Sequence, residues 1–279
     1  MSARLLPSRP AHRVWGRRDL PAWANAGSGS GEPIGEIWHE DPAGDAAPLL
    51  IKHIFTAERL SIQVHPDDDA ARARGHRRGK DEAWFILDAA PGAVIGLGLR
   101  REVSPGELRA AALDRSIEGL IDWRPARAGE LIYSPAGTVH AIGAGISLVE
   151  VQQNLDLTYR LYDYGRPREL HLDEAVAVAR PGPWRVGPPP AEIAPGREVL
   201  AAGGAFVVER WRLGGEARID GAGAGLLLIP VATGGAVDGR PLEAGRVWRV
   251  EGTARVEGGI DLLAAYPGAA AREGLLRAA

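Results

Sequence analysis

The chain has 279 residues, of which 45% are hydrophobic and 25% are charged, and its formal net charge is -3 at pH 7. This length and composition are typical of a globular protein that buries one large core or two smaller ones. The net charge indicates no basic surface for nucleic acid, and the apolar runs are shorter than the ~20 residues of a membrane span, so neither kind of partner is expected.

Two absences in the sequence narrow the chemistry and the location. The chain contains no cysteine, which excludes disulfide bonds and thiolate ligands, so any metal must be bound by His, Glu, Asp or Gln. Residues 1–10 include arginines but no apolar core of the signal-peptide type. We therefore expect a cytoplasmic protein.

The N-terminal part is predicted to lead into a β domain. Residues 1–33 are rich in Pro, Arg, Gly and Ser, which predicts a surface lead-in with a flexible loop at 27–31. Residues 34–38 and 49–55 have strand-like patterns, with a turn at 42–45 between them. The histidines in this part that lack ligand-like neighbours are interpreted as ordinary hydrogen-bonded or solvated side chains: His12, His39, His53 and His76.

Residues 60–66 are a predicted strand with one polar face. Because side chains alternate along a strand, Ser61, Gln63 and His65 share one face, and the apolar residues between them share the other. The apolar face is expected to pack in the core. The polar face could hold a metal.

A carboxylate opens the next predicted strand, at residues 82–87. This carboxylate belongs to Glu82, and Lys80 lies on the same side of the chain. The loop before it, residues 72–80, is basic and broken by glycine. We interpret the loop as a solvated connection that could also draw an anionic substrate toward the site.

Helices are predicted next, because Ser104, Pro105 and Glu107 form a capping box with proline at the first helical position. The helix is expected to continue to Leu113, and a second helical stretch is expected at 117–121. No polar side chains converge in these helices, so their predicted role is structural.

Residues 129–140 predict a strand, a Pro-x-Gly turn and a histidine that begins another strand. The spacing G-x5-P-x-G-x2-H resembles the second motif of the cupin barrel, in which the turn brings the histidine to face the ligands of the first motif. A Gln, His, Glu and His set of donors suits zinc or another divalent metal, with open positions for substrate. These donors are Gln63, His65, Glu82 and His140.

Two further strands are predicted at 146–152 and 156–164. Glu150 lies on one face of the first, and Thr158 shares a face with Arg160 on the second. A short helix is expected from Asp173 to Ala179, before a proline. These strands follow the turn that carries His140.

The remainder predicts a linker and a second β unit. The linker covers 181–195 and the second unit 196–268, where four strands are expected, at 205–213, 225–233, 245–251 and 260–265. The last histidine of the chain is His171, so this unit cannot repeat the metal site. We interpret it as a degenerate second cupin that covers the first or completes its sheet.

Together these segments resemble type I mannose-6-phosphate isomerase in its short bacterial form. The resemblance runs from about residue 14 to 180, and the residues that carry it are the motifs at 60–68, 79–84, 135–141, 150–154, 158–164 and 168–171. It implies a mainly β cupin (jelly-roll) barrel with a few helices at 34–180, followed by a smaller degenerate cupin-like domain at 196–268. It also implies an enzyme that interconverts mannose 6-phosphate and fructose 6-phosphate.

The family's site residues carry over by position. Its zinc ligands, one ion per chain, correspond to Gln63, His65, Glu82 and His140, and its catalytic arginine corresponds to Arg160. Two departures from the general cupin pattern are visible. Gln63-Val64-His65 replaces His-x-His, which is itself a feature of this family and argues against the iron or manganese oxygenases. Alanine replaces the asparagine that often follows the second motif.

The isomerisation requires a polarised carbonyl, a stabilised enediolate and a proton carrier. A divalent metal supplies polarisation, and Arg160 suits the negative charge that develops on the enediolate. Lys80 or Glu150 is the candidate acid and base. The candidates for the substrate phosphate are Ser61, Lys80 and Arg160.

Three rival functions remain open at this level: a non-enzymatic sugar-binding cupin, a metal-dependent cupin oxygenase, and another sugar isomerase. Arg160 and Lys80 beside the ligand set favour an enzyme, because binding alone would not require all of them. A small sugar phosphate is the expected partner. The sequence does not determine the oligomeric state.

Overall fold

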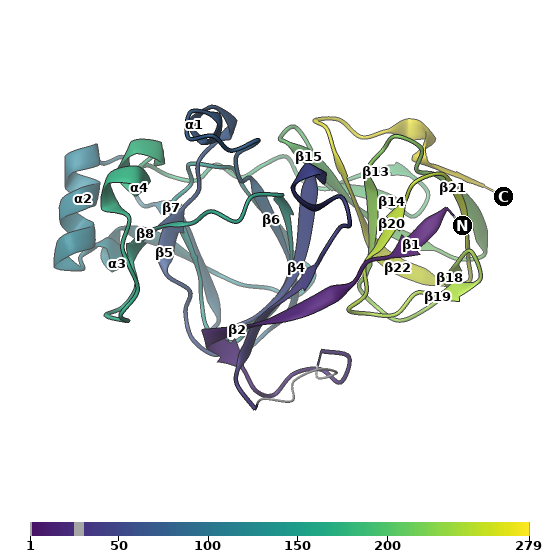
Figure 1. Ribbon diagram of the computed structural model, residues 1–279, viewed down its shortest axis with the longest axis horizontal. Coiled ribbons are helices and arrows are strands. Elements are labelled where there is room, and N and C mark those ends of the chain that lie inside the picture. Colours follow the sequence, from purple (N-terminus) through teal and green to yellow (C-terminus); the bar gives the residue numbers. More distant parts are fainter. Residues whose placement is uncertain (1, 25–30, 279) are drawn as a thin grey trace.

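The strands of the computed structural model, which describes residues 2–24 and 31–278, form four antiparallel sheets, and the helices are few (Figure 1). The mainly β class is therefore confirmed. Two sheets, whose strands lie within residues 8–162, build an N-terminal unit, and two build a C-terminal unit, with strands within residues 191–278 and the first strand of the chain. Within the described residues, no helix is long and apolar enough to cross a membrane.

The N-terminal unit consists of a six-stranded sheet and a five-stranded sheet that share a core. The first contains β2 (Ser8–Arg17), β3 (Ile34–His39), β4 (Leu49–Phe55), β11 (Ile146–Gln153), β6 (Glu82–Ala89) and β9 (Leu131–Ser134) in spatial order. The second contains β12 (Tyr159–Tyr162), β5 (Ile62–Val64), β10 (His140–Ile142), β7 (Val94–Leu99) and β8 (Ile121–Pro125). Ile54, Trp84 and Leu148 of the first sheet pack with Ile95 and Ile142 of the second. The candidate site occupies the polar part of the same interior.

The helices of the chain are α1 (Asp68–Arg72), α2 (Pro105–Asp114), α3 (Ile117–Leu120) and α4 (Leu172–Val178), with 3-10 turns η1 (Gly44–Ala46) and η2 (Glu273–Leu275). Helices α2, α3 and α4 cover the outer face of the five-stranded sheet, where Leu108 and Ala175 pack against Ile62 and Val64. The side chain of Ser104 caps α2, as predicted. Only α1 has no counterpart among the predicted helices.

The C-terminal unit contains a seven-stranded and a five-stranded sheet. The first is ordered β1 (Ala3–Leu5), β20 (Trp248–Val250), β17 (Leu226–Pro230), β22 (Ile260–Pro267), β15 (Phe206–Leu213), β14 (Arg197–Ala201) and β13 (Ala191–Ala194). The second is ordered β19 (Arg240–Pro241), β18 (Ala236–Val237), β21 (Thr253–Glu257), β16 (Glu216–Asp220) and β23 (Leu276–Ala278). The seven-stranded sheet also packs on the six-stranded sheet, through Phe206, Val208 and Leu263 against Ile51 and Val149.

The N-terminal lead-in is more ordered than the sequence predicts. Strand β1 pairs with β20 in the C-terminal unit, and β2 is the edge strand of the six-stranded sheet (Figure 1). Pro10 and the arginines of β2 hide the strand pattern, since such residues are tolerated at a sheet edge. The flexible loop expected at 27–31 lies almost entirely outside the described residues.

The predicted linker also contains a strand. Residues 191–194 form β13, which pairs with β14 at the edge of the seven-stranded sheet. All four of its side chains are exposed, so no apolar alternation marks it in the sequence. The domain limits at 180 and 196 stay a prediction.

Candidate metal and active site

Three of the predicted metal ligands lie together in the interior of the N-terminal unit. His65 follows β5, Glu82 begins β6 and His140 begins β10, and their ligand atoms lie within 4.8 Å of one another. Nε2 of His65 is 3.2 Å from Oε1 of Glu82, and Nε2 of His140 is 3.5 Å from Oε2. All three side chains are buried. Among the described residues, this is the one His, Cys, Asp and Glu group that could hold a metal ion.

Backbone carbonyls orient both imidazoles. Nδ1 of His65 lies 2.8 Å from the carbonyl oxygen of Leu157, and Nδ1 of His140 lies 2.9 Å from that of Thr138. A carbonyl can only accept, so Nδ1 carries the proton and Nε2 presents a lone pair to the cluster. The turn is held by Gly137, at φ +85°, whose N–H donates to the carbonyl of His65.

The charges of the cluster are those of a metal site. Burial lowers the pKa of His65 to about 3 and also lowers the pKa of His140, so both rings are neutral. Burial opposes ionisation of Glu82, but the charge of Lys80, whose Nζ lies 3.0 Å from Oε1, helps to hold the pKa of Glu82 well below its ordinary value. Two lone pairs therefore face a carboxylate whose Oε2 is buried without a hydrogen-bond partner. A bound cation would satisfy all of these atoms.

Gln63 faces the same cluster. Its Nε2 lies 3.3 Å from Nε2 of His140 and 3.5 Å from Nε2 of His65, and its Oε1 accepts a hydrogen bond from the Ser61 hydroxyl. The two ends of an amide exchange places by a half turn of the side chain. Such a turn would direct the amide oxygen toward the cluster and leave the NH2 group to donate to Ser61.

A cavity of about 560 Å3, the site cavity, opens from this cluster. The predicted catalytic and substrate-binding residues that line it are Ser61, Gln63, Lys80, Glu82, Glu150 and Arg160. His65 and His140 are not among its lining residues, but they contact Gln63 and Glu82, which are. The structure therefore brings every predicted site residue to one place.

Glu150 and Lys80 occupy different electrostatic environments. Burial and the negative charge of Glu82 raise the pKa of Glu150 to about 7, although Lys52 and Lys80 oppose the rise. Lys52 Nζ lies 3.5 Å from Glu150 Oε1, and Trp84 Nε1 donates to Oε2 at 3.1 Å. Burial disfavours the charge of Lys80, but the carboxylate of Glu82, 3.0 Å away, raises the pKa of Lys80 above its ordinary value.

Arg160 lines the site cavity without a carboxylate partner among the described residues. Its Nε is buried and makes no hydrogen bond, and burial and the charge of Arg168 lower its pKa. The neighbouring cations are already paired, Arg168 with Asp163 at 2.6 Å and Arg13 with Glu36 at 2.6 Å. A guanidinium remains charged at any neutral pH, so Arg160 is the cation with capacity for an anionic ligand.

Sequence reasoning did not assign several residues of the site cavity: Arg13, Glu36, Lys52, Arg168 and His171. A signal existed for Lys52, since a lysine in the middle of a buried strand is rarely accommodated without a partner. Arg168 and His171 belong to a motif that supported the resemblance, but no role followed from it. Arg13 lies in the edge strand β2, which the composition of residues 1–33 did not indicate as a strand.

No family model matches the chain. It is 32% identical over 246 residues to the mannose-6-phosphate isomerase of Streptococcus mutans serotype c, a match that covers 82% of this chain and 77% of that protein. It is 37% identical over 161 residues to the mannose-6-phosphate isomerase ManA of Bacillus subtilis, which covers 53% of this chain and 51% of that protein.

Solved structures show the same fold. The crystal structure of the mannose 6-phosphate isomerase from Bacillus subtilis matches with a TM-score of 0.80 and 26% identity, over 95% of this chain and 99% of that one. A mutant of phosphomannose isomerase from Salmonella typhimurium matches with a TM-score of 0.76, over 96% of this chain and 100% of that one. Its identity of 16% makes this second likeness one of fold alone. The coverage includes both units of the chain.

Proposed function

Because the chain belongs to the mannose-6-phosphate isomerase family, we propose that it interconverts mannose 6-phosphate and fructose 6-phosphate through a cis-enediol. The observation that carries this proposal is the convergence in one cavity of a candidate metal cluster, an unpaired guanidinium and a carboxyl group with a near-neutral pKa. The reaction moves a proton between C1 and C2. It therefore needs each of these three groups.

The metal we propose is zinc, one ion per chain. Nε2 of His65, Nε2 of His140 and the carboxylate of Glu82 would hold it, with the amide oxygen of Gln63 as a fourth ligand. Nitrogen and oxygen donors of this kind suit zinc, and the unpartnered Oε2 of Glu82 supports the assignment. When bound, such an ion would polarise the sugar carbonyl as a Lewis acid.

Glu150 is the proton carrier that the electrostatics favour. With a pKa of about 7, its carboxyl group can both take up and release a proton near neutral pH. Lys80 is less suited to this role, since its ion pair with Glu82 keeps it protonated. We assign Lys80 to holding Glu82 ionised and to binding substrate oxygens.

Arg160 is proposed to stabilise the enediolate. It has no carboxylate to release before it binds an anion, and its position in a half-buried cavity strengthens its interaction with developing charge. The alternative role is to bind the substrate phosphate, for which Ser61 and Lys80 are the other candidates. Ser61 donates to Gln63 and Lys80 is paired with Glu82, so both are already engaged.

The test is a coupled assay of the purified protein with mannose 6-phosphate, before and after removal of metal by a chelator. We expect fructose 6-phosphate to form, the rate to fall on chelation and the rate to return with zinc. Binding of the sugar without turnover would identify a sugar-binding protein. Turnover that requires oxygen would identify an oxygenase, and turnover of a different aldose alone would identify another isomerase.

A further inference from the structure

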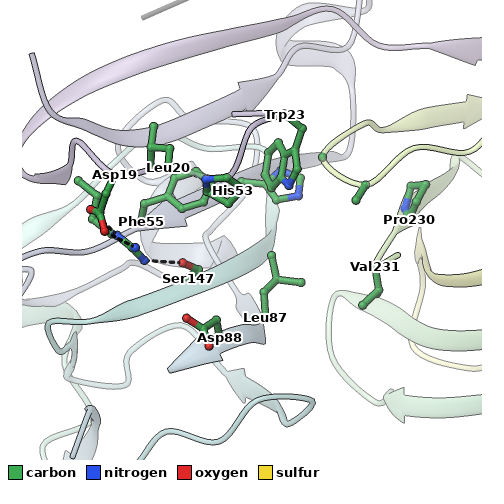
Figure 2. Close-up of a pocket in the computed structure, with 14 residues that line it drawn as sticks. Asp19, Leu20, Trp23, His53, Phe55, Leu87, Asp88, Ser147, Pro230 and Val231 are labelled. Carbon is green, nitrogen blue, oxygen red and sulfur yellow. Dashed lines mark hydrogen bonds and ion pairs between the residues drawn. The ribbon is translucent and has the colours of Figure 1, made fainter. Parts of the chain in front are cut away.

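A second cavity of about 500 Å3, the rear cavity, lies between the six-stranded sheet and the C-terminal unit (Figure 2). Strand β4 separates it from the site cavity, because Lys52 lines the site cavity and the next residue, His53, lines the rear cavity. On β11, Glu150 lines the site cavity and Ser147 lines the rear cavity. The two cavities therefore lie on opposite faces of one sheet and share no lining residue.

His53 provides the rear cavity with a hydrogen-bond donor. Its Nδ1 lies 2.8 Å from Nε2 of His39, while Nδ1 of His39 is buried without a partner. Burial lowers the pKa of His53 to about 3 and that of His39 well below its ordinary value, so both rings are neutral. If His53 donated to His39, the proton of His39 would sit on its unpartnered Nδ1, and a buried N–H without an acceptor costs more than a buried lone pair. His39 therefore donates, and His53 carries its proton on Nε2.

That Nε2 of His53 makes no hydrogen bond to any described residue, but unlike Nδ1 of His39 it is not among the buried unpartnered atoms, so it is accessible from the rear cavity that His53 lines. The N–H of His53 therefore presents a donor to the rear cavity, and its acceptor must come from there. A protein group does not fill this role within the described chain. The geometry calls for a ligand oxygen or a water.

Two acceptors line the same cavity as this donor. Asp88 and Ser147 face each other across the paired strands β6 and β11, and both line the rear cavity. The carboxylate of Asp88 makes no hydrogen bond or ion pair with a described residue. The Ser147 hydroxyl accepts from Arg17 at 3.1 Å, and Arg17 is paired with the exposed Asp19 at 3.0 Å.

The charge of the lining selects against anions. One arginine stands against two aspartates, and the histidine is neutral, so the rear cavity is net negative. A phosphorylated ligand would be repelled by Asp88, and a cation could not accept hydrogen bonds from the His53 and Arg17 donors. Hydroxyl groups donate and accept at once, and therefore suit a cavity with donors and acceptors side by side.

An aromatic wall completes the rear cavity (Figure 2). The ring of Trp23 meets His53 edge to face at 4.8 Å and lies 5.8 Å from the ring of Phe55. Trp23 packs directly on Gly245 of the C-terminal unit, where an added Cβ would lie 2.0 Å from the indole. The wall is thus held by contact between the two units, and it offers an apolar surface to the C–H face of a ring.

We propose that the rear cavity binds a neutral hexose, a sugar ring without phosphate, with its hydroxyls on His53, Ser147 and Asp88 and its apolar face on Trp23 and Phe55. This site is separate from the one at which the isomerisation is proposed to occur. Its existence does not depend on that function.

The experiment is calorimetric titration of the metal-loaded protein with methyl α-D-mannopyranoside. This glycoside has no phosphate and no free carbonyl, so it cannot be isomerised. We expect binding with a Kd on the order of 1 mM, as is ordinary for a small neutral ligand. Asp88→Ala, an exposed change, should weaken binding about 10-fold or more by removing a charged acceptor. Ser147→Ala should also weaken it.

Two controls distinguish the cavities. Asp69→Ala removes another exposed aspartate, which lines neither cavity, and should leave the affinity unchanged. Arg160→Ala alters the site cavity and should also leave it unchanged. Absence of binding to the wild-type protein, or binding that Asp88→Ala preserves and Arg160→Ala abolishes, would overturn the proposal. A preference for benzyltrimethylammonium over the glycoside would likewise overturn it, in favour of an organic cation.

Discussion

Replacing Arg160 by alanine tests the chemical role of the site most directly. Arg168 and Arg13 are held by Asp163 and Glu36, so neither is free to replace the lost guanidinium. Loss of a preorganised charge stabiliser lowers kcat by roughly 10²-fold or more, which corresponds to about 2.7 kcal/mol of transition-state stabilisation. We expect that fall in kcat, with metal content unchanged because the Arg160 side chain makes no hydrogen bond or ion pair with His65, Glu82 or His140.

Stability should change little in this variant. Arg160 makes no ion pair with a described residue and its Nε lacks a hydrogen bond, so its removal breaks no buried pair. The control is Arg166→Ala, which removes another arginine of the same segment that does not line the site cavity; unlike Arg160, Arg166 is paired with Asp163, at 2.7 Å. Steady-state kinetics and metal analysis of both variants measure the effect. A raised KM with kcat nearly unchanged would assign Arg160 to the phosphate, and wild-type rates would refute both roles.

Three further results are expected. His140→Ala should remove both metal and activity, and elemental analysis that finds stoichiometric metal in this variant would contradict the ligand assignment. Gly245→Ala should destabilise the protein by about 2 kcal/mol or more in denaturant unfolding, because φ is +80° and the new methyl group would clash with Trp23. The control Gly187→Ala places its methyl group in open space and should leave stability nearly unchanged. As pH falls, the free energy of unfolding should decrease more steeply for the wild type than for His53→Gln. The pKa of His53 is about 3 in the folded protein against an ordinary 6.5, so its neutral ring contributes fully to stability above pH 6.5, and this contribution falls by about 1.4 kcal/mol per pH unit as pH drops toward 3. Equal slopes of unfolding free energy against pH in the two proteins would reject this account.

The alternation of residues 60–66 allowed the polar face of β5 to be predicted correctly. Ile62 and Val64 are in the core beneath the helices, while Gln63 and His65 face the cluster. The signal is local, because period-two alternation needs no knowledge of the partner strand. The convergence of Glu82 with these residues is not local. It came from the resemblance, and the pairing of β5, β10 and β6 in two sheets is what produces it.

Strand β4 shows why other site residues escaped prediction. All seven of its residues are buried, so no alternation indicates which side chains face the site cavity. Lys52 and His53 are neighbours in sequence with opposite surroundings, and the His39 contact of His53 depends on the register of β3 with β4. The pKa of Glu150 could not be predicted either, because burial and charges from three other strands and a loop determine it.

The C-terminal unit, which has no histidine and contributes no residue to the candidate metal cluster, has a role that follows from packing. The rear face of the six-stranded sheet carries a set of buried apolar side chains that contact the seven-stranded sheet: Leu49, Ile51, Ala83, Phe85, Val149 and Val151. Burial of a Val, Leu, Ile or Phe side chain contributes about 1.5–3 kcal/mol, so this contact is worth on the order of 10 kcal/mol, which is comparable with the whole stability of a domain. The strands that position Lys52 and Glu150 are therefore held in place by the C-terminal unit. The face of the six-stranded sheet that lines the site cavity depends on the packing of its opposite face.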